Sequence, residues 1–367
     1  MQLIYLSPVP WTSFAQRPQK FVRWFHEVTG GDVLWVEPYP SRFPHLSDFK
    51  NRAISDRTEC DHAEPWLTIV TARALPVEPL PGSGWINGLL MWDKALKRVK
   101  CFSEQAETLL VIGKPTVMAL KILAMTPNTV SVYDAMDDFP SFYGGWSKKA
   151  MGQREIAIAK KTTHMLVSST KLSEKWKKYR IDLNLVPNAL DSHLLPKIKI
   201  NELPENSMVL GYVGTIGAWF DWEWVIKLAT VRPQDKVRLI GPIYKPSHLP
   251  LPSNIELLPA CSHEKALNAM LMFDIALIPF LKNALTDSVD PIKYYEFKAL
   301  GLPIISTNFG EMSYRSAEHG VYLSNDIDSL NADVEKALKY KSNFDEIEKF
   351  RTENSWNHRF SKLDFIL

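Results

Sequence analysis

The chain has 367 residues, of which 46% are hydrophobic and 23% are charged, and its formal net charge is +2. This composition excludes a disordered or fibrous chain, and the length favours two globular domains of about 150 to 200 residues each. No apolar run reaches the roughly 18 residues that a membrane-spanning helix needs, so any membrane contact is expected to be peripheral.

The N-terminus and the cysteines indicate the compartment. The first residues lack the basic start and the long apolar run of a secretory signal. Cys60, Cys101 and Cys261 are far apart and form no C-x-x-C pair that would suggest zinc or a redox dithiol. A reduced, cytoplasmic protein is therefore expected.

In the first half of the chain, short apolar runs alternate with amphipathic segments, which is the pattern of repeated βα units. The less regular region 41–65 is predicted to be a long loop. Strands are predicted at 3–9, 32–37, 67–72, 109–112, 130–134 and 164–168, and helices around 17–28, 84–99, 115–124, 147–161 and 170–179.

The pattern changes at Val186-Pro-Asn-Ala-Leu-Asp191, and the Lys-, Pro- and Glu-rich segment that follows, up to Ser207, is predicted to be a linker. The alternation then restarts. Strands are predicted at 208–213, 236–240, 255–258, 275–280, 303–307 and 321–323. Two Rossmann-like, doubly wound parallel-sheet domains facing a cleft are the simplest account, and such sheets bind ligands at the carboxyl ends of their strands.

Three regions follow from this pattern. The first domain is predicted over 1–190 and the second over 191–343. The final stretch, 344–367, has a helical pattern with a large aromatic residue, and it is predicted to return to the first domain.

The segment from Asp290 to Glu296 has the features of a helix start that can hold a ligand. Asp290 is predicted as the N-cap and Pro291 as the first helical residue. Lys293 lies in the first turn, where the helix dipole disfavours a cation unless an anion such as phosphate binds beside it. Glu296 lies on the same helix face, and its carboxylate can accept both hydroxyls of a ribose. The alternative is an ordinary surface ion pair between Lys293 and Glu296.

Glycines follow two predicted strands of the second domain. Leu210-Gly-Tyr-Val-Gly-Thr-Ile-Gly217 runs from a strand into a glycine turn, and glycines allow a backbone to approach a phosphate closely. The spacing differs from the G-x-G-x-x-G fingerprint of dinucleotide sites. A plain strand-to-helix turn is the alternative. The candidate ligand residues are Gly214, Thr215, Gly241 and Pro242.

Acidic residues end one strand of the first domain. Val132-Tyr-Asp-Ala-Met-Asp-Asp138 places three acids at the carboxyl edge of the predicted sheet. A carboxylate at this edge can act as a general base or bind a sugar. Asp137 and Asp138 are the candidates, and the alternative is that Asp138 caps a helix while the others are solvated.

Positive charge is concentrated in the first domain. Arg17 opens the helix after the first strand, where it can meet a phosphate or cap the helix. From Phe142 to Arg180 there are ten lysines and arginines against two glutamates. This stretch favours anionic partners such as lipid, and a solvated basic surface is the alternative.

The segment Asp290-Pro-Ile-Lys-Tyr-Tyr-Glu-Phe-Lys-Ala-Leu-Gly-Leu-Pro-Ile-Ile-Ser-Thr307 resembles the donor-site segment of the large retaining glycosyltransferase family 4 and its relatives of the glycosyltransferase B fold. Its Asp-Pro-Ile-Lys form is similar to bacterial capsule, O-antigen and exopolysaccharide glycosyltransferases. The family motif has two glutamates separated by seven residues, and Ser288 stands at the first of these positions. The glycine turn, the helix start at Arg17 and the junction at 186–191 also resemble this family.

The resemblance implies a hexosyltransferase-like enzyme of the glycosyltransferase B fold. In that family the glutamate matching Glu296 holds the donor ribose, and the loop matching Gly214 and Thr215 contacts the donor diphosphate. The implied reaction moves a sugar from UDP-sugar or GDP-sugar to a glycan or polyprenyl-linked saccharide, with retention, at the inner face of the cell membrane. No cofactor besides the donor and no nucleic acid partner is expected.

Other functions remain open. A nucleotide-sugar epimerase of the same architecture and a noncatalytic protein that binds sugar nucleotides or glycans are the alternatives, and a base at Asp137 or Asp138 makes inversion possible. No catalytic metal is expected, because none of the nine histidines forms an H-x-x-x-H pair. Asp326-x-Asp328 precedes a helix and is predicted to cap it.

Overall fold

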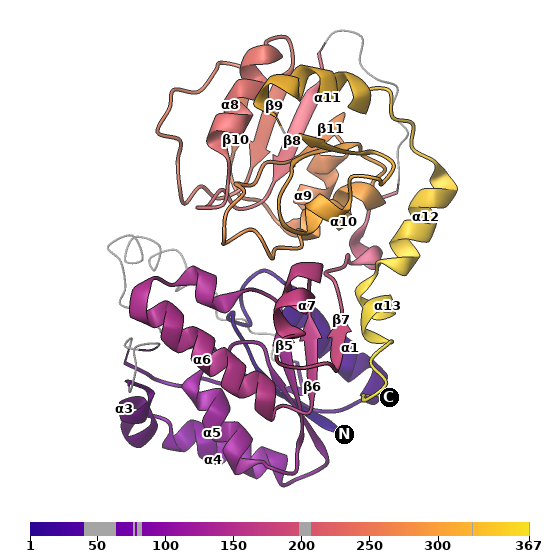
Figure 1. Cartoon of the computed structure of the whole chain (residues 1–367). Helices are drawn as coiled ribbons and strands as arrows, with labels where there is room; N and C mark the ends of the chain where they lie inside the picture. The colour runs from indigo at the N-terminus through magenta and orange to yellow at the C-terminus, as the bar shows by residue number, and fades with distance from the viewer. Residues whose placement is uncertain (40–63, 76–77, 79–82, 198–206, 325, 367) are drawn as a thin grey trace. The chain divides into compact units, whose positions relative to one another are not determined.

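The computed structural model describes residues 1–39, 64–75, 78, 83–197, 207–324 and 326–366. Most of the predicted loop at 41–65, Cys60 and most of the predicted linker lie outside these residues. The chain divides into two compact units, Met1–Val186 with Leu363–Leu367, and Pro187–Lys362 (Figure 1).

The first unit contains a parallel sheet with the strand order β3-β2-β1-β4-β5-β6-β7. The six predicted strands are present, and β7, a short edge strand, was not predicted because three residues carry no clear period. The strands are β1 (Gln2–Leu6), β2 (Val33–Val36), β3 (Leu67–Val70), β4 (Thr108–Ile112), β5 (Val130–Ala135), β6 (His164–Val167) and β7 (Leu183–Leu185). The helices are α1 (Arg17–Thr29), α3 (Ser83–Leu90), α4 (Asp93–Ser103), α5 (Val117–Met125), α6 (Gly145–Lys161) and α7 (Thr170–Trp176).

The single helix predicted around 84–99 is wrong, because the chain forms α3 and α4 there with a break before Asp93. Trp92 lies at the break and is fully buried, with its ring 5.4 Å from that of Tyr39. Asp93 then stands in the first turn of α4, where a carboxylate stabilises the helix dipole.

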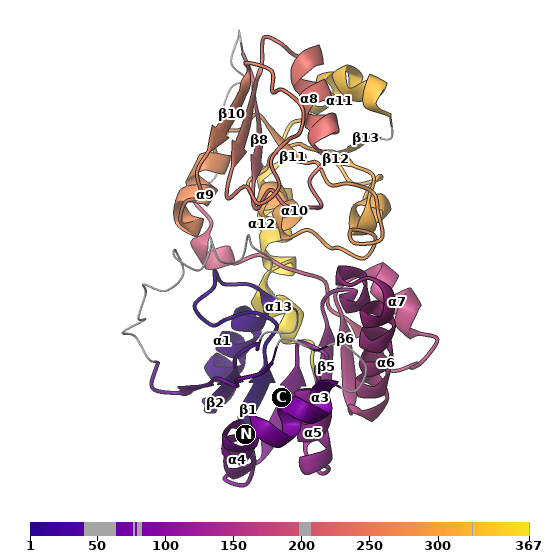
Figure 2. The same cartoon turned by 90° about the vertical axis from the view of Figure 1, so that its left-hand side faces the viewer.

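The first sheet is covered on both faces because successive strand residues point to opposite sides. Tyr5 packs toward α1, where its ring lies 5.9 Å from that of Phe21. Ile4 and Leu6 belong instead to the core that α4 to α7 cover, which includes Trp176. Figure 2 shows α1 on one side of these strands and α6 and α7 on the other.

The second unit contains a parallel sheet with the order β10-β9-β8-β11-β12-β13. All six strands predicted for this half are present. They are β8 (Val209–Val213), β9 (Lys236–Ile240), β10 (Ile255–Leu258), β11 (Ile275–Ile278), β12 (Ile304–Thr307) and β13 (Val321–Ser324). The helices are α8 (Trp222–Val231), α9 (His263–Met270), α10 (Ile292–Ala299), α11 (Leu330–Ala337), α12 (Phe344–Glu353) and α13 (Trp356–Phe360).

The second sheet also has a core on each face. Ile275 and Leu277 of β11 pack with α8 and α11. Ala276 and Ile278, the alternate residues of the same strand, pack with α9 and α10. Figure 2 shows α8 and α11 together on one side of this sheet and α9 on the other.

The terminal segment is shared between the units. Helices α12 and α13 belong to the second unit, where Phe350 packs on the rings of Tyr294 and Tyr295. The last residues belong to the first unit, where Phe365 stacks on His164 with ring centroids 4.1 Å apart.

Both sheets reverse their strand order beside the first strand of the unit, between β1 and β4 and between β8 and β11. Each half therefore has the doubly wound, Rossmann-like topology that was predicted, with a switch point at which such folds bind ligands. In the second unit the carboxyl end of β8 at this point leads directly into Gly214.

Candidate functional site

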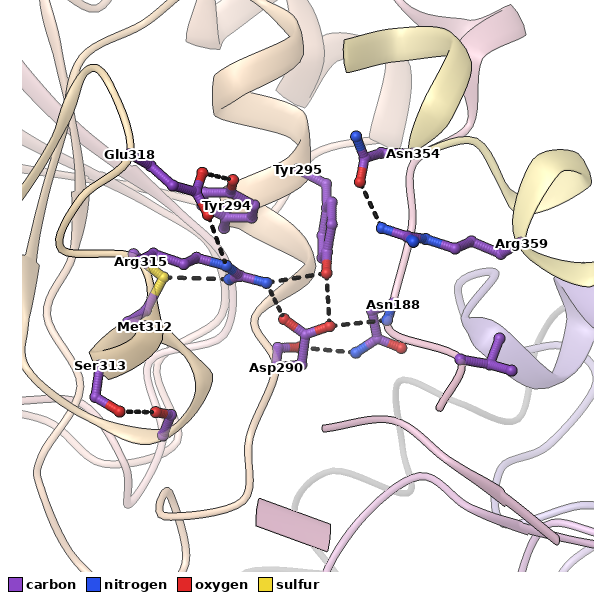
Figure 3. A network of polar contacts seen from close by, with 12 residues as sticks. Asn188, Asp290, Tyr294, Tyr295, Met312, Ser313, Arg315, Glu318, Asn354 and Arg359 are labelled. Atoms are coloured by element: carbon purple, nitrogen blue, oxygen red, sulfur yellow. Dashed lines mark hydrogen bonds and ion pairs between the residues drawn. The ribbon is translucent and has the colours of Figure 1, made fainter. Parts of the chain in front are cut away.

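Helix α10 begins after Pro291, which occupies the N-cap position without a side-chain hydrogen bond. The prediction that Asp290 caps this helix is wrong. Its buried carboxylate accepts hydrogen bonds from the Asn188 backbone N–H at 2.8 Å, from the Tyr295 hydroxyl at 2.8 Å and from Nη2 of Arg315 at 2.7 Å (Figure 3). These partners occupy the carboxylate because a buried charge needs hydrogen bonds and a countercharge.

The partner arginine is itself enclosed. The guanidinium of Arg315 lies 3.6 Å from the ring centroid of Tyr294, and its Nη2 also donates to the Tyr295 hydroxyl at 2.9 Å. Burial lowers the pKa of Arg315, but the interactions with Asp290, Tyr295 and Tyr294 together outweigh this effect and the pKa is raised. Arg315 therefore stays charged, and the predicted contact of Asp290 with a ligand stays a prediction.

The Glu296 carboxylate is held from two sides. Its Oε2 accepts from Nζ of Lys293 at 2.5 Å, and its Oε1 lies 2.8 Å from Nε2 of His263 at the start of α9. Glu296 is 5% exposed, so the contact differs from the ordinary surface ion pair that was the alternative. Two ionisable side chains, one from each of two helices, thus meet at the carboxylate of Glu296.

The charge state of Glu296 follows from these contacts. Burial raises the pKa of Glu296, whereas the Lys293 cation and the hydrogen bond from His263 lower it, and the net pKa is lowered. The carboxylate is consequently ionised at neutral pH and serves as a hydrogen-bond acceptor.

The glycines at the ends of β8 and β9 allow two backbones to touch. Gly214 and Gly241 have φ angles of 154° and 145°, which L side chains rarely adopt. A Cβ atom on Gly241 would lie 2.1 Å from the carbonyl oxygen of Gly214. The two strand ends, paired in register as far as Val213 and Ile240, therefore continue side by side beyond the sheet.

Thr215 and Pro242 extend this close approach. The carbonyl of Thr215 accepts from the Tyr212 hydroxyl at 3.0 Å, and the carbonyl of Pro242 accepts from the Ile216 N–H at 2.9 Å. The predicted residues at these two strand ends are thus neighbours at the carboxyl edge of the second sheet. Their contact with a ligand stays a prediction.

Asp138 in the first unit is engaged by neighbouring side chains. It accepts from Nζ of Lys175 at 2.6 Å and from the Ser141 hydroxyl. The same lysine donates to buried Glu155 at 2.7 Å. Asp138 precedes a 3₁₀ turn but makes no side-chain capping bond, so the capping alternative is wrong for this residue.

Asp137 has a different environment although it is adjacent in sequence. Burial raises the pKa of Asp137 to about 7, with the charges of Asp134 and Asp138 adding to the increase and that of Arg17 opposing it. A carboxyl group with a pKa near 7 exchanges protons readily at physiological pH, which suits a general base. The raised pKa of Asp137 and the partners that already engage Asp138 distinguish the two residues, and the role of either as a base stays a prediction.

Arg17 is buried in the first unit. Its Nε and Nη2 form a forked pair with the carboxylate of Asp134, at distances of 2.8 to 3.1 Å, and its Nη1 donates to the Val186 carbonyl at 2.7 Å. The helix cap is provided instead by a capping box of Gln16 and Gln19, so the capping alternative for Arg17 is wrong. Its contact with a phosphate stays a prediction.

Four contributors were not singled out from the sequence: His263, Arg315, Lys175 and Tyr295. His263, Arg315 and Lys175 lie at least 20 residues along the chain from the site residues that they contact. Tyr295 lies inside the segment from Asp290 to Glu296, five residues after Asp290, but the sequence does not show which group its hydroxyl contacts. His263 carried one usable signal, since it opens a helix after a predicted strand end. Only the packed structure brings it to Glu296.

The predicted Asp326-x-Asp328 cap is confirmed, because the Asp326 carboxylate accepts from the Asp328 N–H at 3.0 Å. Within the described residues, histidine, cysteine and acidic side chains form no group of three that could hold a metal ion. Of the helices described, none combines the length and apolarity needed to cross a bilayer.

Comparison with known proteins adds to this geometry. No model of a known protein family matches the chain. A curated relative, TuaH of Bacillus subtilis (strain 168), is a candidate glycosyltransferase of teichuronic acid biosynthesis and is 25% identical over 206 residues, covering 50% of this chain and 51% of its own. The chain therefore spans about half the length of the curated relative that it matches.

Solved structures resemble the chain along its whole length. A sucrose-phosphate synthase from Thermosynechococcus elongatus has a TM-score of 0.69 at 12% identity, over 100% of this chain and 98% of its own. Anabaena HepE in complex with UDP and glucose has a TM-score of 0.67 at 13% identity, over 100% of both chains. The galactosyltransferase WaaB of the lipopolysaccharide outer core has a TM-score of 0.62 at 11% identity, over 100% of this chain and 99% of its own.

Two parallel α/β units, a switch point in each sheet and these neighbours lead to one conclusion about the architecture. The chain resembles glycosyltransferases and has the glycosyltransferase B fold.

Proposed function

We propose that the protein is a glycosyltransferase of bacterial surface polysaccharide synthesis. It would move a sugar from a nucleoside-diphosphate sugar to a glycan or polyprenyl-linked saccharide. The relative TuaH, named for teichuronic acid biosynthesis, supports the pathway class. HepE, solved with UDP-glucose, supports a UDP-sugar over a GDP-sugar as the first donor to test.

The observation that carries the proposal is the ionised, buried Glu296 held between Lys293 and His263 near the start of α10. Free backbone N–H groups and a lysine at a helix N-terminus are suited to a diphosphate. A carboxylate one turn further is suited to the ribose hydroxyls. In the proposed complex Lys293 exchanges its pairing with Glu296 for the donor phosphate.

The remaining candidate residues of the second unit would also have separate roles in binding the donor. Gly214, Thr215, Gly241 and Pro242 would line the donor pocket, because the glycines allow a phosphate to approach the backbone closely at these strand ends. Asp290 would hold the first residues of α10 rather than the sugar itself. The second unit would thus bind the donor, and the first unit would present the acceptor.

We propose a retaining and metal-independent course. The acceptor hydroxyl would attack the anomeric carbon from the face that the diphosphate leaves, the carbon–phosphate oxygen bond would break, and the hydroxyl proton would pass to a phosphate oxygen. Lys293 and the helix start would stabilise the charge that develops on the diphosphate. In an inverting course Asp137 would take the proton of the acceptor hydroxyl instead. Its raised pKa suits a general base, and this supports the inverting course as the alternative.

Peripheral attachment to an anionic membrane is a further part of the proposal. Phe142 and Trp146 are 54% and 81% exposed, and exposed Lys148 and Lys149 follow them on α6. Aromatic rings favour the headgroup level of a bilayer, and lysines favour its anionic surface. The wild type should sediment with phosphatidylglycerol vesicles, and Trp146→Ser should stay in the supernatant. Equal sedimentation of the two proteins would contradict a membrane contact at this surface.

The central test is a thermal-shift screen of UDP, GDP, ADP and CMP against the wild type, Glu296→Ala and the control Glu353→Ala, which alters an exposed glutamate of α12. At about 100 times its dissociation constant the correct nucleotide stabilises the wild type by about 2.7 kcal/mol. We expect this stabilisation to survive in the control and to be lost in Glu296→Ala. If no nucleotide stabilised the wild type, the proposal would be wrong.

Turnover separates this proposal from its alternatives. Release of free nucleotide from a donor sugar, dependent on a glycan acceptor, indicates a transferase. Conversion of the donor sugar without release would indicate the epimerase, and binding without turnover would indicate a noncatalytic protein.

A further inference from the structure

The Glu296 carboxylate has a partner on each oxygen, and the two partners come from different helices. Lys293 lies three residues before Glu296 on α10, so the pairing of this lysine is a local consequence of helix spacing. His263 is 33 residues away in sequence and reaches Oε1 from the start of α9. The histidine contact therefore depends on how α9 and α10 pack on the sheet.

The three side chains differ in their access to solvent. The Glu296 side chain is 6% exposed, whereas those of Lys293 and His263 are 21% and 35% exposed. Among the described residues, the His263 side chain forms a hydrogen bond with Glu296 alone. The carboxylate is thus oriented by two side chains that are partly exposed to solvent.

Orientation matters because a carboxylate binds two neighbouring hydroxyls only when its plane is fixed. Each carboxylate oxygen has two acceptor sites, so one bond to His263 leaves Oε1 a second site for a ligand hydroxyl. Without His263, Oε1 would lose the one hydrogen-bond partner that it has among the described residues. The side chain could then turn about its terminal torsion, which is broad for glutamate.

We infer that His263 is a positioning residue for nucleotide ribose: it fixes the Glu296 carboxylate so that both ribose hydroxyls can donate to it. This inference rests on the proposed function and adds a residue to it. A purely structural role, in which the contact only joins α9 to α10, predicts that all nucleotides are affected alike. A positioning role predicts an effect that depends on the ribose hydroxyls.

The experiment measures dissociation constants by titration calorimetry for UDP, 2′-deoxy-UDP and 3′-deoxy-UDP. The proteins are the wild type, His263→Ala, His263→Gln, Glu296→Gln and the control His319→Ala. His319 is a suitable control because its side chain is 64% exposed in the same unit and pairs with an exposed glutamate. If the nucleotide screen selects another base, its diphosphate and deoxy analogues replace those of uridine.

We expect the wild type to prefer UDP over at least one deoxy analogue by about 10-fold or more, since a hydrogen bond to a charged group has this magnitude. His263→Ala should weaken the binding of UDP by about 10-fold and leave that of the deoxy analogue nearly unchanged. The ratio of the two dissociation constants should therefore approach one. His263→Gln, whose amide can donate to Oε1, should restore most of the preference. His319→Ala should match the wild type.

Equal weakening of UDP and its deoxy analogues in His263→Ala would overturn the inference in favour of a structural contact. An unchanged UDP affinity would overturn it as well. If UDP bound the wild type and Glu296→Gln weakened it while His263→Ala did not, the proposed function would stand and only this inference would fall. If no nucleotide bound the wild type, both would fall.

Discussion

An arginine–aspartate pair is buried in each unit, and the two pairs are built differently. In the first unit Arg17 forms a fork with Asp134 through Nε and Nη2. In the second unit Arg315 reaches Asp290 through Nη2 alone and is otherwise enclosed by aromatic rings, with Tyr294 at 3.6 Å. The first pair depends on the planar guanidinium, and the second depends on packing and on a shared hydroxyl.

Both pairs also hold the chain where it passes from one unit to the other. Arg17 donates to the carbonyl of Val186, and Asp290 accepts from the N–H of Asn188. Between these two anchored residues lies Pro187, whose ring restricts φ. Arg17 and Asp290, both predicted to be ligand residues, thus each also hold the backbone of this segment.

The largest expected effect comes from breaking the second pair. Arg315→Met leaves the fully buried side chain of Asp290 without its countercharge, and we expect it to reduce the free energy of unfolding by about 3–5 kcal/mol. Chemical denaturation measures this change. Lys349→Met is the control, because it breaks a surface pair whose side chains are 73% and 54% exposed and should cost under about 1 kcal/mol. Equal losses in the two variants would contradict the assigned importance of burial.

The first pair can be tested without removing its charge. Arg17→Lys keeps a cation beside Asp134 but loses the fork and one hydrogen bond or more, so we expect a loss of about 1.5–3 kcal/mol in unfolding free energy. Arg23→Lys on the same helix is the control, since its side chain is 46% exposed. A loss below that of the control would show that the fork contributes nothing beyond charge.

A smaller effect is expected from the shared hydroxyl of the second pair. Tyr295→Phe removes the group that donates to Asp290 and accepts from Arg315, while the ion pair remains. We expect a loss of about 1 kcal/mol in unfolding free energy. Tyr322→Phe, in a half-buried position, should be close to neutral. A Tyr295→Phe loss as large as that of Arg315→Met would mean that the network acts as one unit.

The last expected effect is a shift in the pH dependence of stability, and it concerns the surroundings of the first pair. Burial raises the pKa of Asp137 to about 7, so its contribution to stability is present below pH 4 and is lost as the pH rises to about 7. The unfolding free energy of the wild type, minus that of Asp137→Asn, should fall over this range. Because the Arg17 cation lowers this pKa, Arg17→Met should move the fall to higher pH. A pH-independent difference would contradict the raised pKa.

The sheets were predictable because their signals are local. Short segments rich in apolar residues, alternating with helical patterns, identify the parallel strands, and β9 and β10 begin and end at the predicted residues. The glycines after β8 and β9 were also readable, since a φ near 150° at a strand end requires glycine. The sequence likewise placed Lys293 and Glu296 on one helix face, because their spacing alone sets that geometry.

Side-chain partners were decided only by the tertiary structure. Nothing local distinguishes an Asp290 that caps a helix from one that binds Asn188, Tyr295 and Arg315, because the outcome depends on which distant groups the packed sheets bring within about 3 Å. The same holds for His263, which meets Glu296 across 33 residues. The sequence by itself thus determined the two parallel sheets and the types of residue at their edges. Burial depends on the whole fold, and it decided which of the charged side chains at those edges pair with other groups of the protein.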